Sequence, residues 1–271
     1  MKTKIVAVTL SLVAIFMATS CQKKKAEDKK TSSTATESAD AGKIKDEIVK
    51  IINSLPSNTE TVNLINSTGA AYLAGFTGED MQTGNLLTRA DKAKAYGTII
   101  FDLAYTNTYK QVESFSKLVK VYESLTKELG FEELVAVQKQ FKTRYQNNKD
   151  NSDSLNILVS DMLKKTNDLV QANGSSSDIS LVFAGAVVKS LNVISYLTLF
   201  APGKDQLISI LQKQKDVINA ACLILDKSPS DPDVAKFNLT LQPINKIFNS
   251  SESFSTQTVE EINKLTSFIS Q

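Results

Sequence analysis

Three side chains in one apolar stretch have the types and the spacing for acid–base or binding chemistry. Asp102 is the one charged residue between Lys94 and Lys110. Tyr105 and Tyr109 follow it at i+3 and i+7, which places both phenols on the helical face of the carboxylate. One interpretation is a ligand groove, in which a carboxylate of raised pKa lies beside two phenols. The alternative is a buried carboxylate satisfied by a partner, because an unpaired buried charge is costly.

Lys189 is the candidate partner for that carboxylate. It is the one charged residue between Asp178 and Lys204, again within an apolar stretch. Asp102 lies five residues after Gly97, and Lys189 lies four residues after Gly185. When the two segments are aligned on their glycines, the β-branched and leucine residues that follow also coincide. We therefore expect Asp102 and Lys189 to approach each other across two central helices and to form a buried ion pair.

The composition excludes several kinds of site. The chain has no histidine, so Ser-His-Asp triads and histidine-ligated metals are excluded. Its two cysteines, Cys21 and Cys222, are too few for a cysteine-cluster zinc site. We expect no metal, no cofactor and no enzymatic activity. Residues 44–271 carry slightly more acids than bases, so no basic face for a nucleic acid is expected.

The N-terminal residues have the pattern of a secretory signal followed by an anchor. Lys2 and Lys4 precede an apolar run, residues 5–17, that is too short to span a bilayer. The stretch ATSC, residues 18–21, resembles the lipobox of bacterial lipoproteins, with Ala18 where that pattern usually has leucine. The resemblance implies a signal peptide over residues 1–20 and lipidation of Cys21.

The segment after the cysteine fits a lipid-anchored protein. Residues 21–42 are rich in Lys, Ser, Thr and Ala and nearly free of apolar side chains, which predicts a disordered linker. Gln22 follows the cysteine where some Gram-negative sorting rules have Asp for retention in the inner membrane. By that resemblance, the protein is expected in the outer membrane, held there by its acyl chains, such as palmitate.

Residues 43–271 are expected to form one all-α domain. Apolar residues recur at helical spacing throughout, and no segment shows sustained strand alternation. SNTE, residues 57–60, is a capping box, and the glycine-rich stretch 75–85 predicts a loop. About ten antiparallel helices follow from the pattern, arranged either as a single bundle or as a two-layer, solenoid-like stack of helical pairs.

Several motifs between residues 50 and 200 resemble a group of uncharacterised helical lipoproteins from Bacteroidota. They are S-L-P-S at residues 54–57, Y-G-x₄-D-L-x-Y at 96–105, L-x-x-E-L-G at 125–130 and D-S-L at 153–155. The resemblance implies an all-α domain and a location in the cell envelope, and it implies no activity.

The function expected from the sequence is a non-enzymatic binding or scaffold module, anchored to the membrane by its N-terminal lipid. Its expected partner is an envelope protein. The alternative is a small-molecule or peptide binder that uses a groove near Asp102, Tyr105 and Tyr109. The two functions differ in what they require, since a binder needs a deep pocket and a scaffold needs a broad exposed face.

Overall fold

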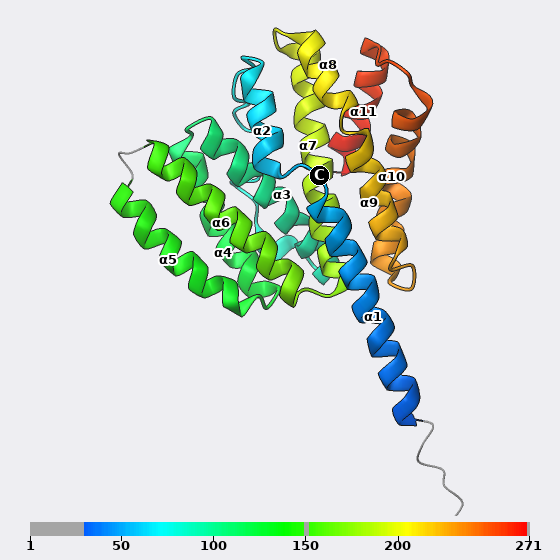
Figure 1. Ribbon diagram of the computed structural model, residues 1–271. Coiled ribbons are helices and arrows are strands. Elements are labelled where there is room, and N and C mark those ends of the chain that lie inside the picture. Colours follow the sequence, from blue (N-terminus) through cyan, green and yellow to red (C-terminus); the bar gives the residue numbers. More distant parts are fainter. Residues whose placement is uncertain (1–29, 149–151, 270–271) are drawn as a thin grey trace, which may run out of the picture. The chain divides into compact units, whose positions relative to one another are not determined.

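The computed structural model describes residues 30–148 and 152–269 of the chain (Figure 1). These residues form helices joined by short connections, and they contain no strand. The predicted all-α class is therefore confirmed. The 3-10 helix η1 (Thr83–Asn85) lies in the loop between α2 and α3. The α-helices are α1 (Lys30–Asn53), α2 (Asn58–Ser67), α3 (Arg89–Thr108), α4 (Val112–Glu128), α5 (Glu132–Asn148), α6 (Ser152–Asn173), α7 (Ser176–Phe200), α8 (Lys204–Gln212), α9 (Lys215–Asp226), α10 (Pro232–Ser250) and α11 (Thr256–Ile269).

The first helix begins earlier than the sequence predicts. α1 starts at Lys30, inside the expected linker 21–42, so the disordered linker does not extend over residues 30–42 in the structure. Residues 30–41 contain no glycine or proline, and alanine and glutamate tolerate a helix well. The helix that is predicted from Lys43 can therefore continue backwards through them.

The remaining N-terminal predictions fall on residues that the structure does not describe. The signal peptide 1–20, the cysteine Cys21 and the linker residues 21–29 lie outside the described ranges. The chain separates into two compact units after Ala39. The second unit, residues 40–271, contains α2 to α11 and the end of α1, and it holds the groups discussed below.

Helices α3 and α7 pack closely against each other in this second unit (Figure 1). A methyl group on Gly97 of α3 would overlap the carbonyl oxygen of Val182, and one on Gly185 of α7 would overlap that of Lys94. The absence of a side chain at both glycines lets the two backbones approach this closely. Gly97 and Gly185, which hold matching positions in the two aligned sequence segments, therefore both lie where α3 and α7 cross.

An ion pair joins the N-terminal ends of these two helices. Arg89 Nε donates to Asp178 Oδ1 at 2.8 Å, and Arg89 Nη2 donates to Asp178 Oδ2 at 3.0 Å. Asp178 also forms a capping box with Ser175 at the start of α7. A bidentate arginine–carboxylate pair fixes orientation as well as distance, so it sets how the ends of α3 and α7 meet.

α7 is the central helix of the bundle. It has the length and the mean hydropathy, 1.6, of a membrane-spanning helix, yet 89% of the apolar window is buried inside the protein. Helices α3, α8, α9 and α11 all contact it. In a solenoid each unit contacts mainly its neighbours along the chain, whereas here one helix is surrounded. The bundle, rather than the two-layer stack, describes this unit.

Three helix boundaries differ from those expected. Apolar periodicity in the sequence predicts a helix from the capping box towards Ala74, one helix over residues 204–226, and a helix that Pro243 kinks or splits. α2 ends at Ser67, short of Ala74, and Gly69 follows with a φ of 77°. The single helix expected over 204–226 is divided into α8 and α9. α10 continues through Pro243 and is not split there. Apolar periodicity alone could not locate the end of α2 or the division between α8 and α9, because apolar residues continue beyond both points.

Candidate functional site

The predicted pair of Asp102 and Lys189 is formed. Lys189 Nζ lies 3.5 Å from Asp102 Oδ1, and the two side chains are 7% and 0% exposed. Lys189 also donates to the carbonyl oxygen of Phe76, and Asp102 Oδ2 accepts a hydrogen bond from the Gly78 amide at 2.8 Å. Both charges therefore hold the covering loop, residues 68–88 between α2 and α3, against the central helices.

The surroundings of Asp102 raise the pKa of its carboxyl group. Burial raises the pKa of this carboxyl to about 6, because a carboxylate deprived of water is costly to ionise. The Lys189 charge and the Gly78 amide oppose this rise, and the Glu79 charge adds to it. Although such a pKa suits general acid–base work, the carboxyl is fully enclosed by protein. The geometry supports the interpretation as a partnered structural charge.

The two tyrosines that were expected to line a groove bind the same loop. Tyr105 OH accepts a hydrogen bond from the Leu73 amide at 3.0 Å, and Tyr109 OH donates to the Ala70 carbonyl at 2.9 Å. Tyr72 of the loop stacks on Tyr105, with ring centroids 5.2 Å apart. Burial raises the pKa of Tyr109 to about 12 and raises that of Tyr105 further.

These contacts correct the predicted groove. Backbone groups within residues 70–78 of the covering loop form hydrogen bonds with Asp102, Tyr105 and Tyr109. In this structure the three side chains therefore bind protein backbone and not a ligand. The prediction placed the right residues on one face of α3. It could not show that the loop before α3 folds back over that face, because the loop's hydrogen bonds to α3 come from its backbone and leave no pattern in the sequence.

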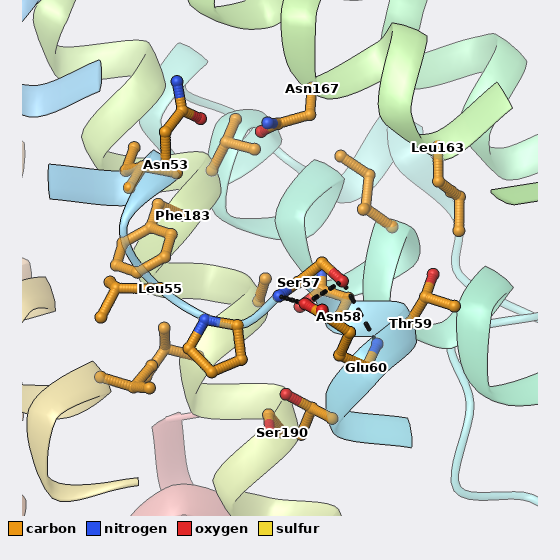
Figure 2. Close-up of a pocket in the computed structure, with 18 of the residues that line it drawn as sticks. Asn53, Leu55, Ser57, Asn58, Thr59, Glu60, Leu163, Asn167, Phe183 and Ser190 are labelled. Carbon is orange, nitrogen blue, oxygen red and sulfur yellow. Dashed lines mark hydrogen bonds between the residues drawn. The ribbon is translucent and has the colours of Figure 1, made fainter. Parts of the chain in front are cut away.

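A cavity of about 500 Å³ lies on another face of the central helix pair and provides the candidate functional site (Figure 2). We call it the α6–α7 cavity, because those two helices supply half of its walls. The residues that line it are Ile52, Asn53, Leu55, Pro56, Ser57, Asn58, Thr59, Glu60, Thr61, Ile100, Ser160, Leu163, Lys164, Asn167, Val170, Gln171, Ile179, Val182, Phe183, Ala186, Val187, Ser190, Gln214 and Val217.

Helical periodicity explains how α7 forms one wall. Its lining residues run from Ile179 through Val182, Phe183, Ala186 and Val187 to Ser190, at steps of three and four. Such steps keep side chains on a single helical face. Lys189 precedes Ser190 and turns away from the cavity towards Asp102. α7 thus carries the ion pair on one face and the cavity wall on another.

The opposite side of the cavity is formed by the turn between α1 and α2 and by polar residues of α6. Ser57 Oγ accepts from the Glu60 amide at 3.2 Å, and the Ser57 amide donates to Glu60 Oε2 at 2.8 Å, as Figure 2 shows. Gln171 Nε2 donates to Asn53 Oδ1 at 3.1 Å. Asn167 is exposed and labelled among the lining side chains in Figure 2. The rim therefore offers amides and hydroxyls.

One buried polar group in this cavity has no partner within the protein. Ser190 is 5% exposed, and its Oγ forms no hydrogen bond in the described structure. Buried polar groups are normally hydrogen-bonded, so an unpaired hydroxyl needs an explanation. Its neighbours on the cavity wall, Ala186 and Val187, are apolar.

The sequence does not reveal this cavity. Its walls come from five separate parts of the chain: the end of α1 with the turn and the start of α2, α3, α6, α7, and the start of α9. Each part read alone is an ordinary helix or helix end. The capping box of residues 57–60 was recognised, but as the start of a helix. The one available signal was a serine in the apolar run of α7, and serine in a helix usually bonds its own backbone.

The described residues show no grouping that would hold a metal ion: no three Cys, Asp or Glu side chains come together there. Cys222 is buried, and burial raises the pKa of its thiol to about 11, with the Asp226 charge acting in the same direction. A thiol with this pKa is protonated at neutral pH and is a poor nucleophile.

Comparisons with protein-family models, with curated proteins and with solved structures find no match for this chain. The resemblance to helical lipoproteins of Bacteroidota therefore stays a prediction from the sequence.

Proposed function

We propose that this chain is a lipid-anchored, non-enzymatic protein of the bacterial cell envelope that binds a small, largely apolar molecule in the α6–α7 cavity. The lipobox-like residues 18–21 support the anchor at Cys21, and Gln22 supports the outer membrane. This proposal moves the binding site away from Asp102 and Tyr105, whose partners are protein groups.

The cavity itself carries the proposal. Small-molecule sites enclose about 300–1,000 Å³, are lined mainly by apolar side chains and contain a few polar groups that orient the ligand. The α6–α7 cavity encloses about 500 Å³, has an apolar wall from α7 and has a rim of amides and hydroxyls. Its residues include no buried acid or base in a position to transfer protons, which favours binding without turnover.

Filling the cavity tests the proposal. The full chain, placed in lipid nanodiscs, is dialysed to equilibrium against naphthalene, with empty nanodiscs as the blank. Ser160 is half-buried in the cavity wall on α6, so Ser160→Phe should fill the space and lower naphthalene binding at least about 10-fold, because a bulky ring competes for the same volume.

Lys165→Phe provides the matched control, because Lys165 is exposed on the same helix and does not line the cavity. This variant should bind naphthalene as the unmodified chain does. Thermal melts followed by circular dichroism verify that both variants fold. The proposal would be overturned if the unmodified chain bound no more naphthalene than the blank, or if both phenylalanine variants bound it equally well.

A scaffold for an envelope protein is the second proposal, and exposed apolar side chains favour it. Leu239 of α10 is 72% exposed and Phe268 of α11 is 77% exposed, on two helices that contact each other. Replacing both by serine should release a bound envelope protein if these helices form its docking surface. The same double change should leave naphthalene binding unaltered, which separates the two functions.

A further inference from the structure

We propose that the ligand of the α6–α7 cavity is a neutral, mostly apolar molecule whose buried end carries one hydroxyl or carbonyl oxygen, and that this oxygen pairs with Ser190 Oγ. The inference rests on the proposed binding function and specifies the chemical class of the ligand. It is carried by the unpaired hydroxyl, by the apolar wall around it and by the positions of the nearby charges.

The other hydroxyls of α7 show why Ser190 is unusual. Ser180 Oγ donates to the Ser176 carbonyl at 2.7 Å, and Thr198 Oγ1 donates to the Ile194 carbonyl at 2.7 Å. Ser195 Oγ donates to the Asn192 carbonyl at 3.1 Å. A buried serine in a helix ordinarily satisfies itself in this way. Ser190, on the cavity wall, forms no such bond.

An unpaired hydroxyl on the wall selects for a ligand that can pair with it. Without a partner, the buried group bears the cost of its lost hydration, and an oxygen at the right place in the ligand removes that cost. A site built around a hydrogen bond discriminates strongly against an analogue that lacks the bonding atom. Ser190 lines the cavity, and Figure 2 labels it among the lining side chains. Its Oγ has almost no accessible surface in this structure, so the pairing requires the side chain to turn to another rotamer that points into the cavity.

The positions of charge indicate that the ligand is neutral. Two of the lining residues are charged, Glu60 and Lys164, and both are exposed. Glu60 binds Ser57 in the capping box, and Lys164 Nζ lies 3.0 Å from Asp168 Oδ2. Neither charge is buried with Ser190. An ionised ligand group at that depth would therefore lack a counter-charge, which is costly in an apolar site.

Two probes of similar shape test the inference. 1-Naphthol carries a hydroxyl and is neutral at pH 7, whereas naphthalene is fully apolar. Each is dialysed to equilibrium against the full chain in nanodiscs and against empty nanodiscs. Ser190→Ala should weaken 1-naphthol binding about 2- to 13-fold, as expected for one hydrogen bond. The affinity of the Ser190→Ala variant for naphthalene should equal that of the unmodified chain or be slightly higher.

Ser180→Ala is the control, because Ser180 is a buried serine of α7 that does not line the cavity. It should change the affinity for neither probe. Equal affinities for both probes in the unmodified chain, or the same loss of both in Ser190→Ala, would overturn the inference while leaving the binding function intact. Absence of naphthalene binding in the unmodified chain would instead overturn the binding function itself.

Discussion

At Asp102, burial and a neighbouring cation act on one carboxyl group in opposite directions. Burial has the larger effect and raises the pKa to about 6, while Lys189 and the Gly78 amide limit the rise. In the unfolded chain the same group titrates near 4. Between these two values the folded protein holds the proton more tightly than the unfolded one. The stability from this group is therefore complete below about pH 4 and is lost as the pH rises through about 6.

Asp102→Asn isolates this effect, because asparagine keeps the shape and cannot ionise. The free energy of unfolding of the unmodified chain, minus that of the variant, should fall by about 2–3 kcal/mol between pH 4 and pH 7. Urea titrations at several pH values measure this difference and cancel the contribution of other carboxyl groups. A difference that rises with pH would show that the Lys189 charge outweighs burial, and a constant difference would show that the two effects cancel.

The sequence could predict this pair but not the whole of its surroundings. Each charge is isolated in an apolar helix, and each lies shortly after a glycine, so the pairing of Asp102 with Lys189 follows from the two local patterns. The bond from Arg89 to Asp178 was missed, because neither residue is isolated among apolar neighbours. Ser190 was missed as well, since an unpaired hydroxyl looks like any other serine in a sequence.

At the scale of elements, the crossing of α3 and α7 depends on two residues without side chains. A methyl group on Gly97 would overlap the Val182 carbonyl, and backbone cannot move aside as a flexible side chain can. Gly97→Ala should therefore destabilise the protein by about 2 kcal/mol or more, despite alanine's better helix propensity. Chemical denaturation followed by circular dichroism gives this value directly.

Gly42 supplies the comparison for this change, since it is a helical glycine of α1 with open space around its Cβ position. Gly42→Ala should leave stability unchanged or raise it by up to about 1 kcal/mol. If Gly97→Ala behaved in the same way, the two helices would not be in backbone contact. The placement of Asp102 opposite Lys189 would then need another explanation.

Helix identity was largely predictable at this scale, and helix ends less so. Apolar periodicity bounded by polar or glycine residues predicts helices over about 88–108, 111–129, 153–172 and 258–269, and α3, α4, α6 and α11 lie close to these bounds. The division between α8 and α9 carries no glycine or proline and was not foreseen. The start of α1 was placed too late, because a polar composition that is typical of linkers is also compatible with an exposed helix.

At the scale of the whole molecule, the cavity and the contact of the covering loop with α7 both join segments that are far apart in the sequence. The covering loop precedes α3 and bonds to α3 and α7, while the cavity joins α1, α2, α3, α6, α7 and α9. Packing of this kind depends on the volumes and directions of many side chains at once. A single sequence fixes the apolar faces that must be buried, but it does not state which faces meet or where a space remains between them.

Membrane attachment is the property of the whole chain that one residue should decide. If Cys21 carries the acyl chains, Cys21→Ala should move the protein from the membrane fraction of its host to the soluble fraction, because the apolar window of α7 is buried in the bundle. Cys222→Ala is the control: that thiol is buried in α9 and should not affect attachment.

Native mass spectrometry of the full chain, extracted in mild detergent, should show the mass of the acyl chains on the unmodified protein and on Cys222→Ala. An unmodified protein without that mass would mean that residues 18–20 serve an ordinary signal peptidase, and membrane retention of Cys21→Ala would place the attachment elsewhere in the chain.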